Sequence, residues 1–143
     1  MVVDFKLSCS SAEFAELSEA LLQLGKAMRF TAHGTSMHPL VRNGDVVLVK
    51  PADARQIRVG DIVLCKKDPE NILVHRVIRK KREANGERFL IQGDQASQSD
   101  GWILQEQVFG RLMSVERGSE RIEFDSLKMK LLNFFAVIRS RWH

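Results

Sequence analysis

Residues 44–50 read GDVVLVK and residues 60–65 read GDIVLC, and these two stretches decide the fold class. Each is a short run of β-branched and aliphatic residues introduced by a Gly-Asp pair, which is typical of a strand that begins at a tight turn. A third run of the same kind, ILVHRVI, covers residues 72–78. We therefore expect the middle of the chain to form a β-sheet.

Further strand signals follow these three runs. The dipeptide at residues 85–86, Asn-Gly, is a hairpin signal that leads into a strand at residues 88–91. Another strand is expected at residues 108–116, and the Gly-Ser pair at residues 118–119 turns it towards residues 121–124. Six or more short strands with tight turns and no intervening helices predict an antiparallel or mixed sheet of the coiled or barrel-like kind.

A helix is predicted before the strands. Ser10 and Glu13 have the spacing of a capping box, and Gly25 is suited to a left-handed helix end. Between them, apolar residues recur every three or four positions and predict one buried stripe: Phe14, Leu17, Leu21 and Leu24. We interpret residues 1–27 as an N-terminal amphipathic helix that precedes a β-rich domain at residues 28–125.

A second amphipathic helix is predicted at residues 126–143. Its apolar stripe consists of Leu127, Leu131, Phe134, Phe135, Ile138 and Trp142. The other positions between residues 127 and 143 include no acidic residue and four strongly basic ones: Lys128, Lys130, Arg139 and Arg141. Packing of this stripe on the domain or on a partner, including a second copy of the chain, is the favoured interpretation; contact with an anionic membrane surface is the alternative.

The composition is that of an ordinary globular protein of 143 residues, with 44% hydrophobic and 28% charged residues. No apolar run approaches the roughly 18 residues that suggest a transmembrane helix, and residues 1–11 do not have the pattern of a secretory signal. We therefore expect a cytoplasmic protein. The two cysteines, Cys9 and Cys65, could form at most one disulfide. Neither a metal site nor a cofactor is expected, because no Cys/His cluster has zinc-ligand spacing.

The formal net charge of +4 gives little information about partners. A basic run at residues 79–82 could attract phosphates, but it lies between two strand-like segments. We interpret this run as the solvated end of a hairpin, and no nucleic-acid partner is expected.

Three positions could carry chemistry. Ser36 lies in GTSMHP (residues 34–39), where a flexible glycine and a proline-stiffened turn can expose a hydroxyl beside backbone N–H groups. His75 lies within the apolar run at residues 72–78 and could act as a base. Asp94 and Asp100 lie six residues apart in a polar loop, and one of them could orient a histidine. Each feature also has an ordinary interpretation, as a turn serine, a half-buried histidine and turn-forming aspartates.

The order of these motifs resembles the signal peptidase I family and its clan, which includes self-cleaving repressors. The resemblance covers residues 30–115, and it implies a coiled β-sheet peptidase domain with a peptide or protein substrate. His75 stands where many members have lysine, as in the Ser/His branch of archaeal and endoplasmic-reticulum signal peptidases. The resemblance implies Ser36 as nucleophile and His75 as base, and it matches Asp94 and Asp100 to two aspartates of that branch. We expect Asp100 to be the catalytic acid and Asp94 to support the loop.

The chain also departs from the pattern of the family. Gly34 occupies the position where the branch often has a serine that assists the oxyanion, so Thr35 and the Ser36 amide are the nearest potential donors. Signal peptidases have a membrane anchor, which we do not expect in this chain. The leading hypothesis is a serine endopeptidase without a transmembrane segment, and the alternative is a non-catalytic peptide-binding or regulatory module that retains the fold.

Overall fold

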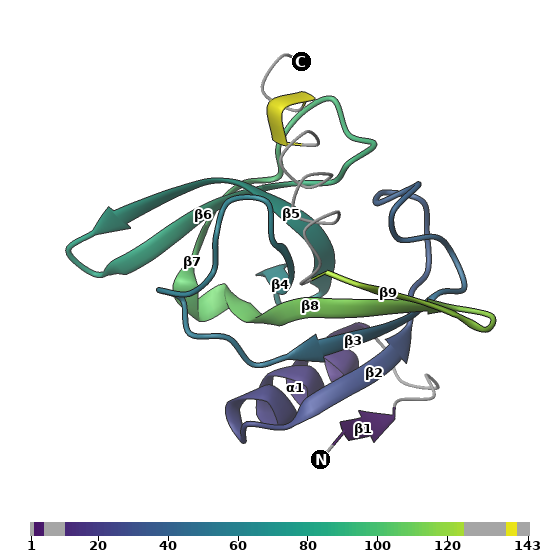
Figure 1. The fold of residues 1–143 in the computed structure, drawn as a ribbon. Helices are drawn as coiled ribbons and strands as arrows, with labels where there is room; N and C mark the ends of the chain where they lie inside the picture. Colours follow the sequence, from purple (N-terminus) through teal and green to yellow (C-terminus); the bar gives the residue numbers. More distant parts are fainter. Residues whose placement is uncertain (1, 5–10, 125–136, 140–143) are drawn as a thin grey trace.

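The computed structural model describes residues 2–4, 11–124 and 137–139 (Figure 1). Within these residues the fold consists of one long helix, one short 3-10 turn and nine strands, with a further helical turn at residues 137–139. Their bounds are β1 Val2–Asp4, α1 Ser11–Gln23, β2 Ala27–Thr31, β3 Val46–Lys50, β4 Ile62–Asp68, β5 Asn71–Glu83, β6 Gly86–Gln92, β7 Gly101–Leu104, η1 Gln105–Gln107, β8 Val108–Arg117 and β9 Glu120–Glu123.

The strands form a curled, mainly antiparallel half-barrel. Their order across the sheet is β1-β2-β3-β8-β4-β5-β6-β7, and β9 pairs with β8. The pairing of β1 with β2 is parallel. The mainly β fold predicted from the sequence is therefore confirmed, and the three predicted runs around residues 44–78 correspond to β3, β4 and β5.

Strand β4 separates two hydrophobic cores, which explains why its first four residues, 62–65, are all apolar. Ile62 and Leu64 belong to a core that includes residues of α1, β2 and β3. Val63 and Cys65 point the opposite way, into a core between β4, β5, β6 and β7. Successive side chains of a strand face opposite sides, so a strand with a core on each side has no polar face.

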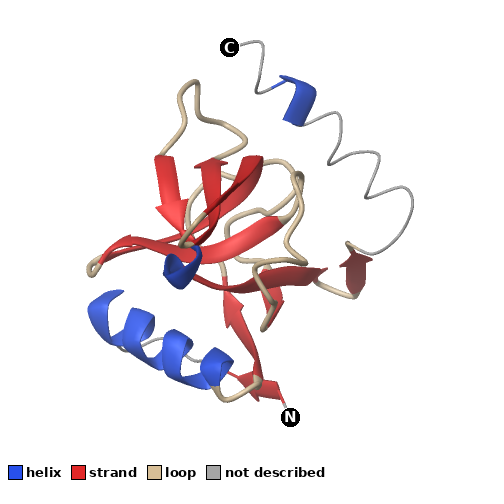
Figure 2. Ribbon diagram, turned by 90° about the vertical axis from the view of Figure 1, so that its left-hand side faces the viewer, coloured by secondary structure: helices blue, strands red, loops and turns tan. Residues whose placement is uncertain are grey.

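Helix α1 packs against the sheet, where it contacts β2, β8 and β5 (Figures 1 and 2). Its most buried residues are Phe14, Ala15, Ser18 and Leu22. The predicted stripe is therefore wrong in part, because Leu17 is 44% and Leu24 is 72% exposed. Ser18 tolerates full burial because its hydroxyl donates a hydrogen bond of 2.6 Å to the Phe14 carbonyl.

The region predicted as the N-terminal helix, residues 1–27, also contains strand residues at both of its ends. Strand β1 precedes the helix, and β2 begins at Ala27. Gly25 has the predicted left-handed conformation, with φ +79°. The predicted cap residue Ser10 lies outside the described residues, as does Cys9. The division of the chain at residues 27 and 125 stays a prediction.

Two turns with the same sequence pattern introduce β3 and β4. Each turn has an arginine three residues before an aspartate, and that arginine's N–H donates to the aspartate carboxylate: Arg42 to Asp45 at 2.7 Å and Arg58 to Asp61 at 2.8 Å. The intervening glycines, Gly44 and Gly60, have φ of +92° and +102°. Because this conformation is costly for residues with a Cβ, glycine is required there.

Both turn aspartates also interact with arginines of β8. Arg117 makes two hydrogen bonds to Asp45, of 2.8 and 3.0 Å, and Arg111 lies 3.6 Å from Asp61. Strand β8 thereby holds the starts of its two neighbours, β3 and β4.

The Asp45 carboxylate is expected to make stability depend on pH. Burial by itself raises the pKa of Asp45, but hydrogen bonds from Arg117 and the Arg42 N–H hold that pKa below its usual range. A carboxyl whose pKa is lower in the folded state stabilises the fold above its unfolded pKa and loses this effect as the pH falls. We therefore expect Asp45→Asn to lower the free energy of unfolding by about 1–3 kcal/mol at pH 7 and by much less near pH 3.

Urea unfolding of both proteins at the two pH values checks this expectation. Asp53→Asn serves as the control, because Asp53 is exposed and makes no ion pair within the described residues. Equal destabilisation by Asp45→Asn at pH 7 and pH 3 contradicts the role of its charge.

Two predicted hairpins are present, with one difference in register. Gly118 and Ser119 form the loop between β8 and β9, as predicted. The loop between β5 and β6 consists of residues 84–85, and Gly86 already pairs with Glu83 in the sheet. Strand β7 was not predicted; it is an edge strand that follows the polar loop at residues 93–100.

The basic run at residues 79–82 is only in part a solvated hairpin end. Arg79 and Arg82 are exposed, as expected. Lys80 instead bonds to a neighbouring loop, donating to the carbonyl oxygens of Ala54, Arg55 and Ile57 at 3.2, 3.2 and 2.7 Å. The solvated interpretation is wrong for Lys80, because its long side chain reaches unpaired carbonyls of that loop.

The predicted C-terminal helix lies mostly outside the described residues. Residues 137–139 form a helical turn in which Val137 is buried and Ile138 is exposed. The other five residues of its predicted stripe are not among the described residues. Within the described part of the chain, no helix has the length and apolar character needed to cross a membrane.

Candidate active site

Ser36 lies in the loop between β2 and β3, with its side chain exposed. The base of this loop is closed by backbone hydrogen bonds between Ala32 and residues 44–45, at 2.8 Å each. Gly34 donates its N–H to the side-chain oxygen of Asn43 at 2.9 Å. The loop therefore projects Ser36 from a fixed base at the end of two paired strands.

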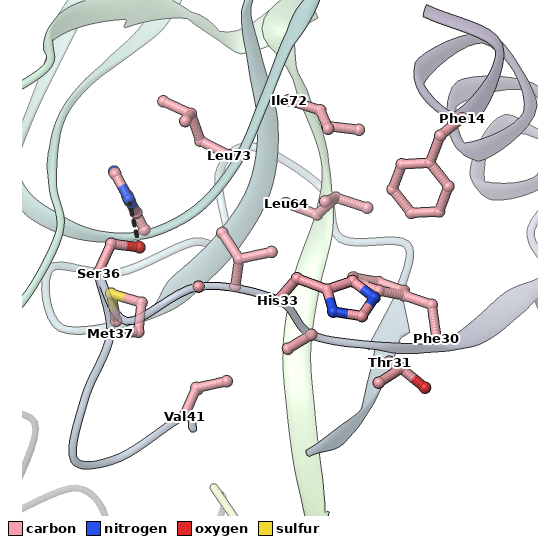
Figure 3. Close-up of a pocket in the computed structure, with 14 residues that line it drawn as sticks. Phe14, Phe30, Thr31, His33, Ser36, Met37, Val41, Leu64, Ile72 and Leu73 are labelled. Atoms are coloured by element: carbon pink, nitrogen blue, oxygen red, sulfur yellow. Dashed lines mark hydrogen bonds between the residues drawn. The ribbon is translucent and has the colours of Figure 1, made fainter. Parts of the chain in front are cut away.

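His75 lies on β5, where its backbone pairs with Val63 of the central strand β4. The residue is 7% exposed. Its Nε2 atom lies 3.1 Å from the Ser36 hydroxyl oxygen, the bond drawn at Ser36 in Figure 3. The fold thus brings together two residues that are 39 positions apart in sequence, within the reach that a base requires.

Asp100 is the carboxylate beside the other nitrogen of His75. The distance from His75 Nδ1 to Asp100 Oδ2 is 2.5 Å. The Asp100 N–H donates to the Ile91 carbonyl at 2.8 Å, which fixes the end of the polar loop against β6. The structure therefore places Ser36, His75 and Asp100 in one continuous chain of hydrogen bonds.

Asp94 takes no part in these hydrogen bonds between Ser36, His75 and Asp100, and it contacts Arg76 instead. The two oxygens of Asp94 accept from Arg76 Nε at 2.8 Å and from its terminal nitrogen at 2.7 Å. A further nitrogen of Arg76 donates to the Gly60 carbonyl at 2.9 Å. The side chains of Arg76 and Asp94 are only 1% and 4% exposed. This buried pair joins β5, the turn before β4 and the start of the polar loop.

Arg76 was not predicted as a site residue, although its sequence position carried a signal. Residues 72–78 are apolar apart from His75 and Arg76, and adjacent residues of a strand face opposite sides. A buried arginine requires an acidic partner. The pattern therefore indicated one acid for each face of β5, without indicating which acid belongs to which face.

Contacts between the Ser36 loop and the polar loop were also missed. Gln95 donates its backbone N–H to the Ser36 carbonyl at 3.0 Å and its side-chain amide to the His38 carbonyl at 2.6 Å. The Asp94 N–H points to the Met37 sulfur at 3.4 Å. These bonds hold the serine-bearing and acid-bearing loops together, and no local sequence pattern signals them.

Gly93 is the point where the two loops and the histidine ring approach most closely. A Cβ atom at this position would lie 3.0 Å from the Ser36 carbonyl oxygen and 3.1 Å from His75 Nε2. Both distances are shorter than ordinary van der Waals contact. Only glycine leaves the ring of His75 where it lies.

Gly93→Ala is therefore expected to displace the His75 ring by a few tenths of an ångström or more. A misplacement of about 1 Å can cost about 10²-fold in rate, so we expect a loss of up to this order in serine acylation. The rate of labelling by a fluorophosphonate probe measures it. Ser97→Ala, an exposed change in the same loop, is the control. If the probe labels Gly93→Ala at the wild-type rate, the expectation is contradicted.

Backbone donors for an oxyanion are present beside Ser36. In the described part of the chain, the N–H groups of Thr35 and Ser36 donate to no protein acceptor, whereas the Gly34 N–H is occupied by Asn43. The assignment of the Ser36 N–H and Thr35 as oxyanion donors stays a prediction.

Cys65 lies near the site but is not suited to nucleophilic chemistry. Burial, and to a smaller extent the charge of Asp100, raises the pKa of the Cys65 thiol to about 12. Thiolate is the reactive form of cysteine, and at neutral pH it is nearly absent here. Among the described residues, no group of three or more His, Cys, Asp or Glu side chains is placed to hold a metal ion.

A cavity of about 520 Å³ opens beside Ser36 and His75. It extends between residues 30–34 on one side and residues 72–75 on the other, and its lining is mostly apolar. Figure 3 shows Ser36 and Met37 at one end of this pocket and Phe14 at the other. The exposed hydroxyl of Ser36 therefore borders a recess that can hold apolar groups.

Comparison with protein families gives one match, to the model described as Peptidase S24-like, over residues 7–96. This range includes Ser36, His75 and Asp94.

Curated relatives match shorter parts of the chain than the family model does. A signal peptidase complex catalytic subunit of Homo sapiens is 33% identical over 86 residues, which cover 53% of this chain and 45% of the relative. The corresponding subunit of Eremothecium gossypii is 34% identical over 67 residues, covering 46% of this chain and 40% of the relative. The chain thus spans less than half of the length of these relatives. No solved structure matches it significantly.

Proposed function

Because the chain belongs to the Peptidase S24-like family, we propose that it is a serine endopeptidase in which Ser36, His75 and Asp100 form the catalytic machinery. The single observation that carries the proposal is the continuous chain of hydrogen bonds, 3.1 Å from Ser36 to His75 and 2.5 Å from His75 to Asp100. The relatives, which are named as catalytic subunits of a signal peptidase complex, support a signal-peptidase-like activity.

The first half of the proposed reaction acylates Ser36. His75 Nε2 accepts the hydroxyl proton while the Ser36 oxygen forms a bond to the substrate carbonyl carbon, and the π electrons of that carbonyl move onto its oxygen. The Asp100 carboxylate accepts a hydrogen bond from His75 Nδ1 and stabilises the imidazolium that results. When the C–N bond breaks, His75 returns the proton to the leaving amine.

The second half restores the enzyme. A water molecule loses a proton to His75 and attacks the acyl carbon, and the Ser36 oxygen leaves and regains the proton. In both halves the negative oxygen needs donors, for which we propose the Ser36 N–H and Thr35. Backbone donors fixed in place lower the barrier because they need no reorganisation during the reaction.

Two strand edges that have no partner strand among the described residues offer a binding site for the substrate backbone. On the side away from β4, β5 begins to pair with β6 at Arg76, so residues 71–75 have no described partner strand on that edge. Strand β1 pairs with β2 only as far as Arg29, and residues 30–34 beyond it border the cavity. An extended peptide can add to such edges by backbone hydrogen bonds. We propose that the substrate is an extended segment of a polypeptide that lies between them.

Arg76, Asp94 and Gln95 have proposed positioning roles. Arg76 and Asp94 hold the start of the polar loop against β5, and Gln95 ties this loop to Ser36 and His38. None of them touches the reacting atoms. We therefore propose that Asp94 supports the loop through its bonds to Arg76.

Reaction with a serine-directed fluorophosphonate tests the proposal. We expect the wild-type protein to be labelled at one site, identified by mass spectrometry as Ser36, and Ser36→Ala to remain unlabelled. Heat-denatured protein should also remain unlabelled, since activation depends on the folded arrangement. Equal labelling of wild type and Ser36→Ala, or none of either, favours the alternative of a binding module without catalysis.

A further inference from the structure

Strand β7 is the outermost strand at one end of the sheet, next to β6 (Figure 1). It pairs with β6 on one side, and no strand of the described residues pairs with its other side. Such an edge presents backbone N–H and C=O groups that can pair with another polypeptide. Proteins commonly protect an edge with lysine, proline or a bulge, and residues 101–104, GWIL, have none of these. Only the shortness of β7 limits pairing at this edge.

Two large apolar side chains of β7 are exposed on one face of the strand. Trp102 is 39% and Leu104 is 43% exposed, whereas Ile103 between them belongs to the buried core. Residues two positions apart in a strand face the same side. Removal of such apolar surface from water is favourable, and tryptophan is among the residues that contribute most to protein interfaces. Trp102 and Leu104 therefore form an apolar patch beside the unpaired edge.

Cations lie beside this patch on the same face of the sheet. Leu104 pairs with Arg88 of β6, which in turn pairs with Lys81 of β5. The Lys81 Nζ atom lies 4.4 Å from the centroid of the Trp102 ring, so its charge is placed above the edge strand. The acid beside these cations is Glu83, which lies 3.3 Å from Lys81 Nζ and 2.7 Å from Arg88 Nε. One carboxylate is thus shared by two cations, and the face keeps a positive charge.

We propose that the edge of β7 binds an extended segment of a partner polypeptide in which an acidic and an apolar residue lie two positions apart. The segment adds to the sheet as a further strand, and its backbone pairs with the unpaired groups of β7. Its apolar side chain covers Leu104, and its carboxylate reaches the Lys81 ammonium above the Trp102 ring. This edge is separate from the edges of β2 and β5 that we propose for the substrate.

An anionic membrane surface is a second class of partner with matching charge, but the open edge argues against it. Insertion of Trp102 and Leu104 into the apolar part of a bilayer would carry the unpaired backbone groups of β7 into a medium without hydrogen-bond partners. An added polypeptide strand covers the same apolar surface and supplies these partners. The edge therefore favours a polypeptide over a lipid surface.

Fluorescence anisotropy with defined peptides tests the proposal. The full chain carrying Ser36→Ala is titrated into a labelled, acetylated peptide in which threonine alternates with glutamate and leucine, and into a matched peptide with lysine in place of glutamate. We expect the glutamate peptide to bind at least tenfold more tightly, and added salt to weaken its binding. Binding should also slow hydrogen exchange of the backbone amides of residues 101–103, measured by mass spectrometry.

Two variants in the Ser36→Ala background test the patch and the charge separately. Trp102→Thr removes the ring but keeps a residue suited to a strand, and it should weaken binding of the glutamate peptide tenfold or more. Lys81→Glu reverses the charge above the edge and should weaken binding about fivefold. Arg121→Glu is the matched control, because Arg121 on β9 is also an exposed cation paired with the acid two residues later, Glu123 at 2.7 Å. It should leave the affinity unchanged.

The outcomes decide between a polypeptide, a membrane and neither. The inference is overturned if the glutamate peptide does not saturate at millimolar concentration, or if neither Trp102→Thr nor Lys81→Glu weakens its binding. Binding to vesicles of phosphatidylcholine and phosphatidylglycerol that both variants abolish, without peptide binding, assigns the patch to a membrane instead. If Trp102→Thr lowers the thermal midpoint, Lys81→Glu and the exchange of residues 101–103 decide. Because binding is measured without the Ser36 hydroxyl, its failure leaves the proposed peptidase function standing.

Discussion

Asp100→Asn is expected to lower the rate of Ser36 acylation by about 10⁴-fold. An asparagine can donate its amide N–H to His75 Nδ1, which then acts as the acceptor and leaves the ring proton on Nε2. A protonated Nε2 cannot accept the proton of Ser36, 3.1 Å away. The catalytic group would keep its geometry and lose its base. Labelling kinetics with a fluorophosphonate measure the loss, and the thermal midpoint should change little because Asp100 is partly exposed.

The control for this prediction is Asp53→Asn, which makes the same chemical change at an exposed position on another loop. The fluorophosphonate should label this variant at the wild-type rate. If Asp100→Asn also labels at that rate, the carboxylate does not set the state of the histidine, and a Ser36–His75 dyad replaces the proposed triad.

Much of the sheet could be predicted because its strands have local signals. Strands β3, β4 and β5 are β-branched runs bounded by turns, and the Gly-Asp pairs that introduce β3 and β4 form the glycine-dependent turns expected of them. These features depend on residues a few positions apart. Sequence patterns report such short-range relations well.

The features that could not be predicted depend on long-range packing. Helical spacing indicated an apolar stripe through Leu17 and Leu24, yet the sheet packs against the face that carries Ala15 and Ser18. Small residues allow a helix to approach a sheet closely, and the Ser18 hydroxyl is satisfied within the helix. Which of two adjacent faces becomes buried was therefore decided by the shape of the sheet.

The candidate site also combines features that local sequence signals indicate with features that depend on long-range packing. The residue types and their order indicated Ser36, His75 and two loop aspartates, and the structure brings three of the four together. It places Asp94 with Arg76, on the other face of β5 from His75. Two carboxylates in one loop look equivalent in sequence. They differ only because adjacent residues of the strand, one a histidine and one an arginine, face opposite ways.

That difference predicts opposite consequences for the two aspartates. Asp94→Ala removes two hydrogen bonds from a guanidinium that is 1% exposed, so its charge stays buried beside an apolar methyl group. Breaking a buried ion pair by removing one partner costs about 3–5 kcal/mol. We expect Asp94→Ala to lower the free energy of unfolding by this amount in urea titrations, whereas Asp100→Asn changes it by less than about 1 kcal/mol.

A double variant separates the charge of Asp94 from its packing. Replacing the pair with apolar groups, as in Arg76→Met with Asp94→Leu, removes the buried charge together with its partner, and such replacements are often neutral or stabilising. Stability should therefore recover relative to Asp94→Ala. Acylation should recover less, because the bonds that joined β5, the Gly60 turn and the polar loop are gone, and Asp100 is held at the end of that loop. Full recovery of both would mean that the pair is needed only to fill space, whereas failure of stability to recover would mean that the loop depends on these bonds for folding itself.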